Sequence, residues 1–183
     1  HVFGTPSLAG RTVVISGYGS VGGRVATALR ADGARVSVSD VDDGKRAAAL
    51  REGLDWVEPD KALGTPADVL VPAAVGGVLT PSTDLSARLV VGPANNQLTD
   101  DSAADALAAN GTVWVPDFVA SAGGVVYTLT REVEGLAHED AVRRVKGIEE
   151  TVRLLLDRAR ETGRTPLAEA KELAAKRLTA SAR

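Results

Sequence analysis

The stretch Thr12-Val13-Val14-Ile15-Ser16-Gly17-Tyr18-Gly19-Ser20-Val21-Gly22 decides the fold of this 183-residue chain. Its first half is an apolar, β-branched run without alternation, which is typical of a strand buried on both faces of a parallel sheet. Its second half is a Gly-x-Gly-x-x-Gly turn that opens an amphipathic run from Val21 to Leu29. A strand, a glycine turn and a helix in this order indicate a dinucleotide-binding unit.

Each glycine has its own role in that hypothesis. Gly17 permits the tight turn, Gly19 lets a pyrophosphate approach the backbone, and Gly22 allows the helix to pack closely on the strand. The phosphates would meet the N–H groups and the positive dipole end of the helix that begins at Ser20. The alternative is that three glycines fall together by chance in a chain that contains 19 of them.

An acid stands at the end of the next apolar run. Asp40 follows Val38 and Ser39 and lies 23 residues after Gly17, close to the ~20 residues expected for the acid that accepts the ribose hydroxyls. Its other possible role is to cap the following helix, and both roles can coexist. Because a carboxylate repels a 2′-phosphate and Arg46 lies a helical turn or more away, we expect NAD to be favoured over NADP.

Apolar runs and helical stretches alternate along the first two thirds of the chain. Strands are predicted over 12–16, 35–39, 54–57, 68–71, 89–91 and 112–115, and helices over 20–32, 44–52, 81–87 and 100–109, with a helical turn at 59–63. From residue 119 only helices are predicted, over 119–135, 139–162 and 166–180.

This alternation predicts an α/β fold, a doubly wound parallel sheet of the Rossmann type with C-terminal helices. Right-handed connections give the strand order 3-2-1-4-5-6. We expect residues 1–10 to form a linker and residues 11–183 to form one dinucleotide-binding domain, helical from about residue 119.

Three further segments follow predicted strands, and parallel sheets bind ligands at the carboxyl ends of their strands. They are 72–77, 92–96 and 116–118, and all are poor in bulky side chains. Asn95 and Asn96 are candidates to hold a nicotinamide carboxamide or ribose, although Asn and Gly also favour plain turns.

Composition excludes several functional classes. The formal net charge of -3 provides no basic field for nucleic acid or an anionic membrane. No apolar run approaches the ~20 residues that span a bilayer, and no segment resembles a signal peptide, so we expect a cytoplasmic protein. Cysteine is absent, which excludes disulfides and thiolate ligands, and no metal site is predicted. Methionine is also absent, so we expect a processed protein or a piece of a larger one.

Five segments together resemble the C-terminal cofactor domain of the amino-acid dehydrogenases acting on glutamate, leucine, phenylalanine and valine, most closely the last three. In chain order they are Gly17–Gly23, Val38–Asp42, Pro72–Gly77, Gly92–Gln97 and Pro116–Gly124. The resemblance runs from about residue 9 to the C-terminus, and the last three segments are the most specific. It implies NAD-dependent oxidative deamination of an L-amino acid to its 2-oxo acid, and the reverse reaction.

The resemblance also assigns roles to residues. The cofactor-binding residues that it implies are Gly17, Tyr18, Gly19, Ser20, Val21, Gly22, Asp40, Val41, Ala73, Ala74, Val75, Asn95 and Asn96. The glycine turn would hold the pyrophosphate, Asp40 the adenosine ribose, and 73–75 the nicotinamide side. Asn95 or Asn96 would touch the nicotinamide ribose or amide. Ser121 stands where the family usually has an Asn that helps to hold substrate or nicotinamide, and it offers a hydroxyl in place of the amide.

No catalytic residue is predicted within this chain. The family's catalytic lysines and aspartate lie in an N-terminal substrate domain, through which the amino acid or 2-oxo acid would bind, and nothing before Gly10 can supply them. The chain's own lysines lie in predicted helices and are expected to be solvated; they are Lys45, Lys61, Lys146, Lys171 and Lys176. Asp117 is either the acid nearest the expected cleft or a helix cap, and His138 is expected to be structural or solvated.

Three functions remain open at this point. The first is the NAD-binding half of an amino-acid dehydrogenase, which binds NAD or NADH without turning over alone and whose full-length form is compatible with a homo-oligomer. The second is a free-standing NAD(H)-binding module that works with a separate substrate domain. The third is a complete small enzyme with other chemistry, which would use Asp117 or Tyr127.

Overall fold

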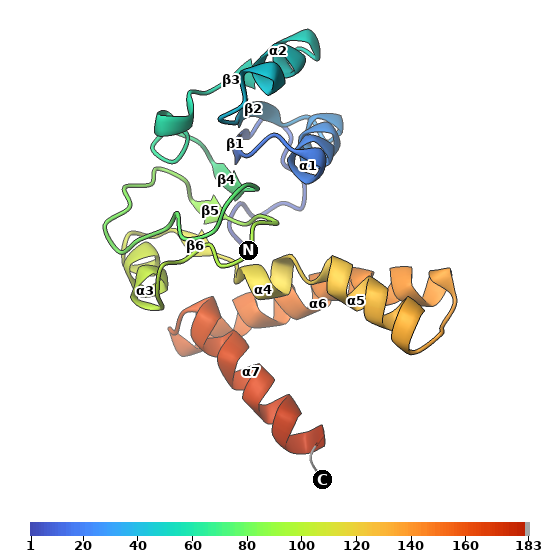
Figure 1. Ribbon diagram of the computed structural model, residues 1–183. Helices are drawn as coiled ribbons and strands as arrows, with labels where there is room; N and C mark the ends of the chain where they lie inside the picture. Colours follow the sequence, from blue (N-terminus) through green and yellow to red (C-terminus); the bar gives the residue numbers. More distant parts are fainter. Residues whose placement is uncertain (182–183) are drawn as a thin grey trace. The chain divides into compact units, whose positions relative to one another are not determined.

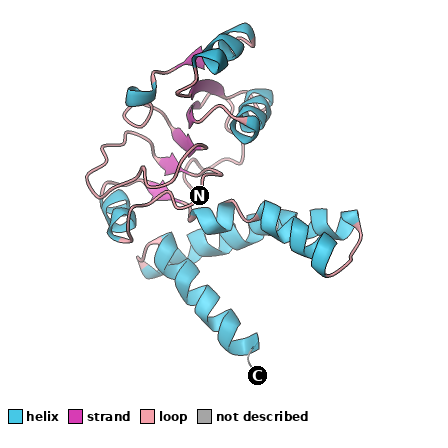
Figure 2. Cartoon of the chain, viewed as in Figure 1, coloured by secondary structure: helices cyan, strands magenta, loops and turns pink. Residues whose placement is uncertain are grey.

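The computed structural model describes residues 1–181. The chain divides into two compact units, with the boundary between Trp114 and Val115. The first unit contains a sheet with flanking helices, whereas the described part of the second unit is helical (Figures 1 and 2).

The first unit is built on a six-stranded parallel sheet in the order β3-β2-β1-β4-β5-β6. Its strands are β1 (Thr12–Ser16), β2 (Arg35–Ser39), β3 (Asp55–Trp56), β4 (Val69–Pro72), β5 (Leu89–Val90) and β6 (Val113–Trp114). Its helices are α1 (Ser20–Ala31), α2 (Asp43–Arg51) and α3 (Ser102–Ala109), with a 3₁₀ turn η1 (Pro59–Lys61). The predicted α/β fold and strand order are confirmed.

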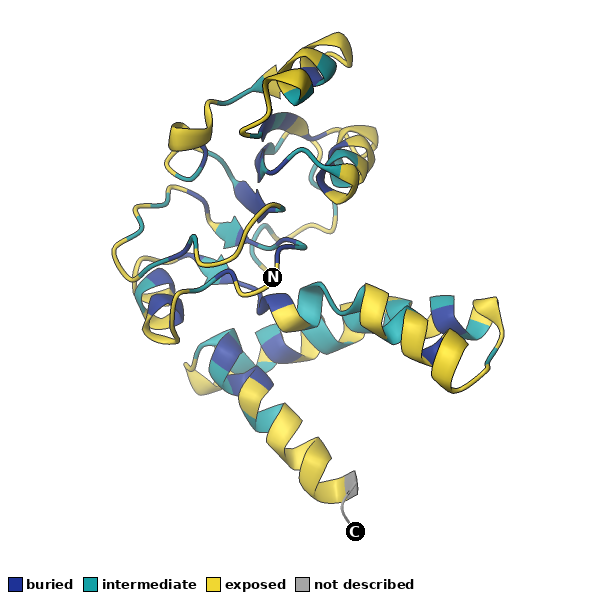
Figure 3. Cartoon of the chain, viewed as in Figure 1, coloured by how far each residue is buried: buried dark blue, intermediate teal, exposed yellow. Residues whose placement is uncertain are grey.

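Strand register places apolar side chains in rows across the sheet. Val13 of β1 lies opposite Val36 of β2 and opposite Val69 of β4. On the same face, Ala26 of α1 and Ala49 of α2 belong to the buried core. Buried residues, dark blue in Figure 3, therefore concentrate on the central strands. Right-handed connections place α1 and α2 on one face of the sheet and α3 on the other (Figure 1).

The parallel arrangement brings loops from distant parts of the sequence to one edge. Because every strand runs in the same direction, the segments that follow β1, β2, β4 and β5 all emerge at the carboxyl edge. These segments begin at Gly17, Asp40, Ala73 and Val91. Four of the five segments that carry the family resemblance thus share one edge of the first unit.

The connection between β4 and β5 differs from the prediction. Residues 81–87 form no helix. Thr80 donates its N–H to Thr83 Oγ1 over 2.7 Å, and Thr83 donates its N–H to the Thr80 carbonyl over 3.0 Å. Hydroxyl side chains that bond the nearby backbone compete with helix formation, and here they close a turn instead.

The second unit begins with short, broken helices. They are α4 (Asp117–Ala120), α5 (Gly123–Thr128) and the π-helical turn η2 (Leu129–Val133). The single helix predicted over 119–135 is therefore wrong. Ser121 and Ala122 interrupt it, just before Gly123 and Gly124, and glycine is a poor helix former.

Two long helices complete the second unit, α6 (His138–Thr162) and α7 (Pro166–Ser181). They match the helices predicted over 139–162 and 166–180, and Gly163 ends α6 in a left-handed conformation with φ 70°. Glu169 of α7 is buried and accepts hydrogen bonds from Arg158 Nε and Thr162 Oγ1, each at 3.0 Å. Within residues 1–181, no helix combines the length and apolar character needed to cross a membrane.

Candidate functional site

The glycine turn packs tightly on one side and is open on the other. A Cβ built on Gly17, whose φ is +116°, would lie 2.6 Å from the carbonyl carbon of Ala73, and a Cβ on Gly22 would lie 2.0 Å from the Gly17 oxygen. A Cβ on Gly19 would meet no described atom within 4 Å. Gly17 and Gly22 are thus required by packing within the protein, whereas Gly19 leaves open space in front of the turn.

The first turn of α1 presents backbone donors. Gly19 is the N-cap residue, and the first helical bond runs from the Gly23 N–H to the Gly19 carbonyl over 2.9 Å. The N–H groups of residues 20–22 precede that bond and so have no acceptor inside the helix. Within the described chain, no side chain caps α1 and its first turn holds no acid. The first N–H groups of α1 are therefore not capped by a side chain, as at the helix N-termini that bind anions.

Hydrogen bonds hold the Asp40 carboxylate beside this turn. Its Oδ2 accepts the Tyr18 N–H over 2.8 Å and Lys45 Nζ over 2.9 Å, and its Oδ1 accepts the Asp42 N–H over 3.2 Å. The side chain is only 9% exposed. Burial acts to raise the pKa of Asp40, but the bonds from Lys45, Tyr18 and Asp42 outweigh it and hold the pKa below its usual value. Asp40 is therefore ionised at neutral pH.

The cap of α2 is a different residue. Asp42 is the N-cap, and its Oδ1 accepts the Gly44 N–H over 2.8 Å. The alternative role considered for Asp40, capping this helix, belongs to Asp42 instead. Asp40 joins the end of β2 to the turn after β1.

The loops after β4 and β5 are bonded to each other. Gly77 donates its N–H to the Asn96 carbonyl over 2.7 Å, and a Cβ on Gly76 would lie 2.5 Å from the Asn95 oxygen. Asn96 has a positive φ of 53°, which is uncommon for a residue other than glycine. A Cβ on Gly92 would lie 2.2 Å from the Pro72 oxygen. The two loops thus form one closely packed surface in which small residues are required.

Two residues that sequence reasoning did not assign to the site support it. Gln97 is fully buried, and its Nε2 donates to the Gly92 and Ala94 carbonyls, each over 2.9 Å. Its Oε1 accepts the Trp114 indole N–H over 3.0 Å. Lys45, predicted to be solvated, is instead the ion-pair partner of Asp40. The available signal for Gln97 was its place directly after Asn95 and Asn96, in a loop of small residues. No local signal marked Lys45.

The remaining predicted residues divide between the two units. In the first unit, the predicted cofactor-binding residues that are exposed at the carboxyl edge are Ser20, Val21, Val41, Ala74, Val75, Asn95 and Asn96. Tyr18 uses both of its donors within the protein, since its N–H binds Asp40 and its hydroxyl donates to Glu52 Oε2 over 2.8 Å.

The other candidates lie in the second unit. Ser121 is the C-cap of α4 and donates its N–H to the Asp117 carbonyl over 2.7 Å. Asp117 is buried, and its Oδ1 accepts the Phe118 N–H over 2.6 Å. The Tyr127 hydroxyl and His138 Nδ1 are hydrogen-bonded to each other over 2.9 Å, as a structural role for His138 requires.

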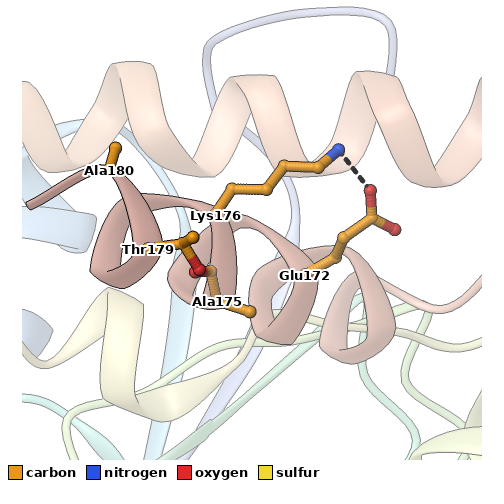
Figure 4. Close-up of a pocket in the computed structure, with 5 residues that line it drawn as sticks. All are labelled: Glu172, Ala175, Lys176, Thr179 and Ala180. Carbon is orange, nitrogen blue, oxygen red and sulfur yellow. Dashed lines mark hydrogen bonds and ion pairs between the residues drawn. The ribbon is translucent and has the colours of Figure 1, made fainter. Parts of the chain in front are cut away.

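A surface hollow of about 520 Å³ lies on α7, away from all of these residues in the sequence. Its lining comes from one helix and consists of Glu172, Ala175, Lys176, Thr179 and Ala180, with Lys176 Nζ donating to Glu172 Oε1 (Figure 4). No predicted site residue lines it. In residues 1–181, no three His, Cys, Asp or Glu side chains gather as a metal ion would require.

The sheet and its glycine edge define a Rossmann-like α/β protein. The family model of glutamate/leucine/phenylalanine/valine dehydrogenase matches residues 41–182. Leucine dehydrogenase from Bacillus cereus is 32% identical over 181 residues, covering 97% of this chain and 49% of that protein. Valine dehydrogenase from Streptomyces coelicolor is 34% identical over 189 residues, covering 97% of this chain and 50% of its own length.

A solved structure agrees with these relatives. The crystal structure of L-tryptophan dehydrogenase from Nostoc punctiforme superposes with a TM-score of 0.91 at 33% identity, covering 98% of this chain and 55% of that chain. The chain belongs to the glutamate/leucine/phenylalanine/valine dehydrogenase family. It spans about half the length of the curated relatives named here.

Proposed function

We propose that this chain forms the NAD(H)-binding part of an L-amino-acid dehydrogenase. The observation that carries the proposal is the contrast within the glycine turn. Gly17 and Gly22 are closed in by backbone, whereas Gly19 faces open space beside the first N–H groups of α1. A pyrophosphate needs this combination of close backbone approach and helix N-terminal donors.

The neighbouring segments supply the rest of a dinucleotide site. Asp40, ionised and beside the turn, would accept the adenosine ribose hydroxyls, with the exposed Val41 next to it. Residues 73–75 would line the nicotinamide side, and Asn95 or Asn96 would contact its ribose or amide. NAD, when bound, supplies the hydride acceptor for oxidation at the amino-acid Cα.

The relatives support a proposal for the substrate class. The named relatives act on leucine, valine and tryptophan, which all have apolar side chains. We infer that the whole enzyme deaminates an amino acid of this kind to its 2-oxo acid. Ser121 is the residue of this chain proposed to contact substrate, and none of its residues is proposed to be catalytic.

A pair of glycine substitutions tests the cofactor site. Gly19→Ala should keep the fold, because the new methyl enters open space at φ -89°, but it should occupy the volume proposed for the pyrophosphate. Gly64→Ala is the matched control, since its Cβ also meets no described atom within 4 Å and it lies outside the site. In NADH fluorescence titrations, Gly19→Ala should raise the dissociation constant at least about tenfold, which equals ~1.4 kcal/mol of binding free energy. Gly64→Ala should leave the dissociation constant unchanged.

The same titration can contradict the proposal. Wild-type protein that does not bind NADH at millimolar concentration would exclude a cofactor role. Equal NADH affinities in the two variants would move the pyrophosphate away from the glycine turn. Thermal unfolding of both variants, recorded alongside, separates lost binding from lost structure.

A further inference from the structure

The acid of the proposed ribose site is already paired with a cation. Lys45 Nζ lies 2.9 Å from Asp40 Oδ2, and the Lys45 side chain is 38% exposed. The pair is built into the fold, because Asp42 caps α2 and so fixes the direction in which the helix leaves β2. The Tyr18 and Asp42 N–H groups hold the carboxylate from the other sides.

The adjacent cation has a different partner. Arg46 Nη1 lies 2.9 Å from Glu58 Oε1, and its guanidinium carbon is 6.0 Å from the centre of the Trp56 ring. Arg46 is therefore drawn toward the segment after β3. Of the two neighbouring cations, Lys45 is the one that contacts Asp40.

We propose that Lys45 sets the cofactor selectivity of this site by neutralising Asp40, so that the chain binds NADPH as well as NADH with only a small preference for NADH. This inference rests on the proposed function. An unpaired carboxylate at the end of β2 rejects NADPH because its charge repels the 2′-phosphate. Here that charge is offset by the ammonium 2.9 Å away, and an ammonium can donate to a phosphate that comes to lie beside Asp40.

The two cofactors differ at the 2′ position of the adenosine ribose. NADPH carries a 2′-phosphate with about two negative charges at neutral pH, whereas NADH carries a hydroxyl there. A hydroxyl that bonds to Asp40 needs only a carboxylate oxygen, and Oδ1 has one protein donor where Oδ2 has two. Removing Lys45 should thus leave NADH binding nearly unchanged and weaken NADPH binding.

The test measures dissociation constants for NADH and NADPH by nicotinamide fluorescence on wild-type protein, Lys45→Met, Lys45→Arg and Arg46→Met. Methionine keeps most of the length and apolar stem of lysine but removes its charge. Arg46→Met is the matched control, with the same loss of charge one residue away. Asp40→Ala provides the opposite change, since it leaves Lys45 without its acid.

The wild-type preference for NADH should be no more than about tenfold. Lys45→Met should raise the ratio of the two dissociation constants by about tenfold, which equals ~1.4 kcal/mol. Lys45→Arg and Arg46→Met should leave the ratio within about threefold of wild type, and Asp40→Ala should reverse it in favour of NADPH.

Two outcomes overturn the inference, and they are distinguishable. If NADH binds and Lys45→Met leaves the ratio unchanged, Lys45 has no part in selectivity while the proposed function stands. If wild-type protein binds neither nucleotide, the proposed function fails and the inference fails with it.

Discussion

The absence of a side chain at Gly22 allows the start of α1 to pack directly against the glycine turn. A Cβ there would lie 2.0 Å from the Gly17 oxygen, so Gly22→Ala must push the start of α1 away from the turn. At the adjacent Gly23, a Cβ would lie 3.6 Å from Tyr18 Cε2, which is an ordinary contact. Of these two neighbouring glycines in one helix, Gly23 has room for an alanine side chain and Gly22 does not.

We expect Gly22→Ala to lower the free energy of unfolding by about 1–3 kcal/mol, the usual range for overpacking. Gly23→Ala should be neutral or stabilising by up to about 1 kcal/mol, because alanine favours a helix over glycine. Urea denaturation of both variants measures the difference. If the two variants are equally stable, the close contact between α1 and the turn does not exist in solution.

Tyr18 is a second residue whose surroundings can be tested, through the pKa of its hydroxyl. Burial raises the pKa of its hydroxyl, the hydrogen bond to Glu52 and the charge of Glu52 raise it further, and Arg30 opposes them, with the result at about 12. The folded state therefore retains the phenol proton to higher pH than the unfolded state, whose pKa is near 10. This contribution to stability is fully present below about pH 10 and is lost as the pH rises through 12.

The titration of Tyr18 can be isolated because the chain has two tyrosines. In a Tyr127→Phe variant, tyrosinate absorbance at 295 nm should rise with a midpoint at about pH 12. Adding Glu52→Gln should move the midpoint down toward 10. A midpoint near 10 without that second change would mean that neither the burial of Tyr18 nor its bond to Glu52 is present in solution.

Among the elements, the loop after β5 depends on one buried amide. Gln97 bonds two carbonyls of its own loop, and its oxygen accepts the indole N–H of Trp114 at the end of β6. The amide therefore supports both the loop and the neighbouring strand. Since Asn95 and Asn96 lie on this loop, its conformation sets where their side chains stand.

Replacing this amide should destabilise the first unit. Gln97→Leu keeps the approximate volume but leaves buried polar groups without a partner, which we expect to cost about 2 kcal/mol. Thr99→Val is the control, since its hydroxyl makes a longer bond of 3.3 Å to the Leu79 carbonyl at a partly exposed position. Urea denaturation followed by tryptophan fluorescence compares them. A Gln97→Leu protein as stable as wild type would show that the loop is held by other contacts.

At the scale of the whole molecule, the sheet is where sequence reasoning succeeded most. The runs 12–16 and 35–39 match β1 and β2 at both ends. In β1 the signal is an uninterrupted apolar stretch, Val13–Ile15, whereas in β2 it is the alternation of Val36 and Val38 with polar residues. The strand order followed from right-handed connections applied to a Rossmann-type sheet, which the glycine turn after the first strand had indicated. Local pattern, a recognised fold type and chain chirality together predicted the topology.

Sequence reasoning failed where hydrogen bonds or helix irregularities replace a regular pattern. The helix expected over 81–87 is absent because Thr80 and Thr83 bond each other. The helix expected over 119–135 is broken at Ser121 and Ala122 and ends in a π turn. The periodicity of apolar residues does not report side-chain hydrogen bonds to the backbone or interruptions of this kind within a helix.

The order of apolar runs and the glycine turn were enough to predict the fold of this chain, and the five segments between Gly17 and Gly124 were enough to predict its family. Only the tertiary structure showed that Lys45 forms an ion pair with Asp40, that Gln97 supports the loop of Asn95 and Asn96, and that open space lies before Gly19 alone of the three motif glycines. The reason is physical. Periodicity and turn chemistry act between near neighbours in the chain, whereas a side chain's partner depends on the direction in which each helix and loop leaves the sheet.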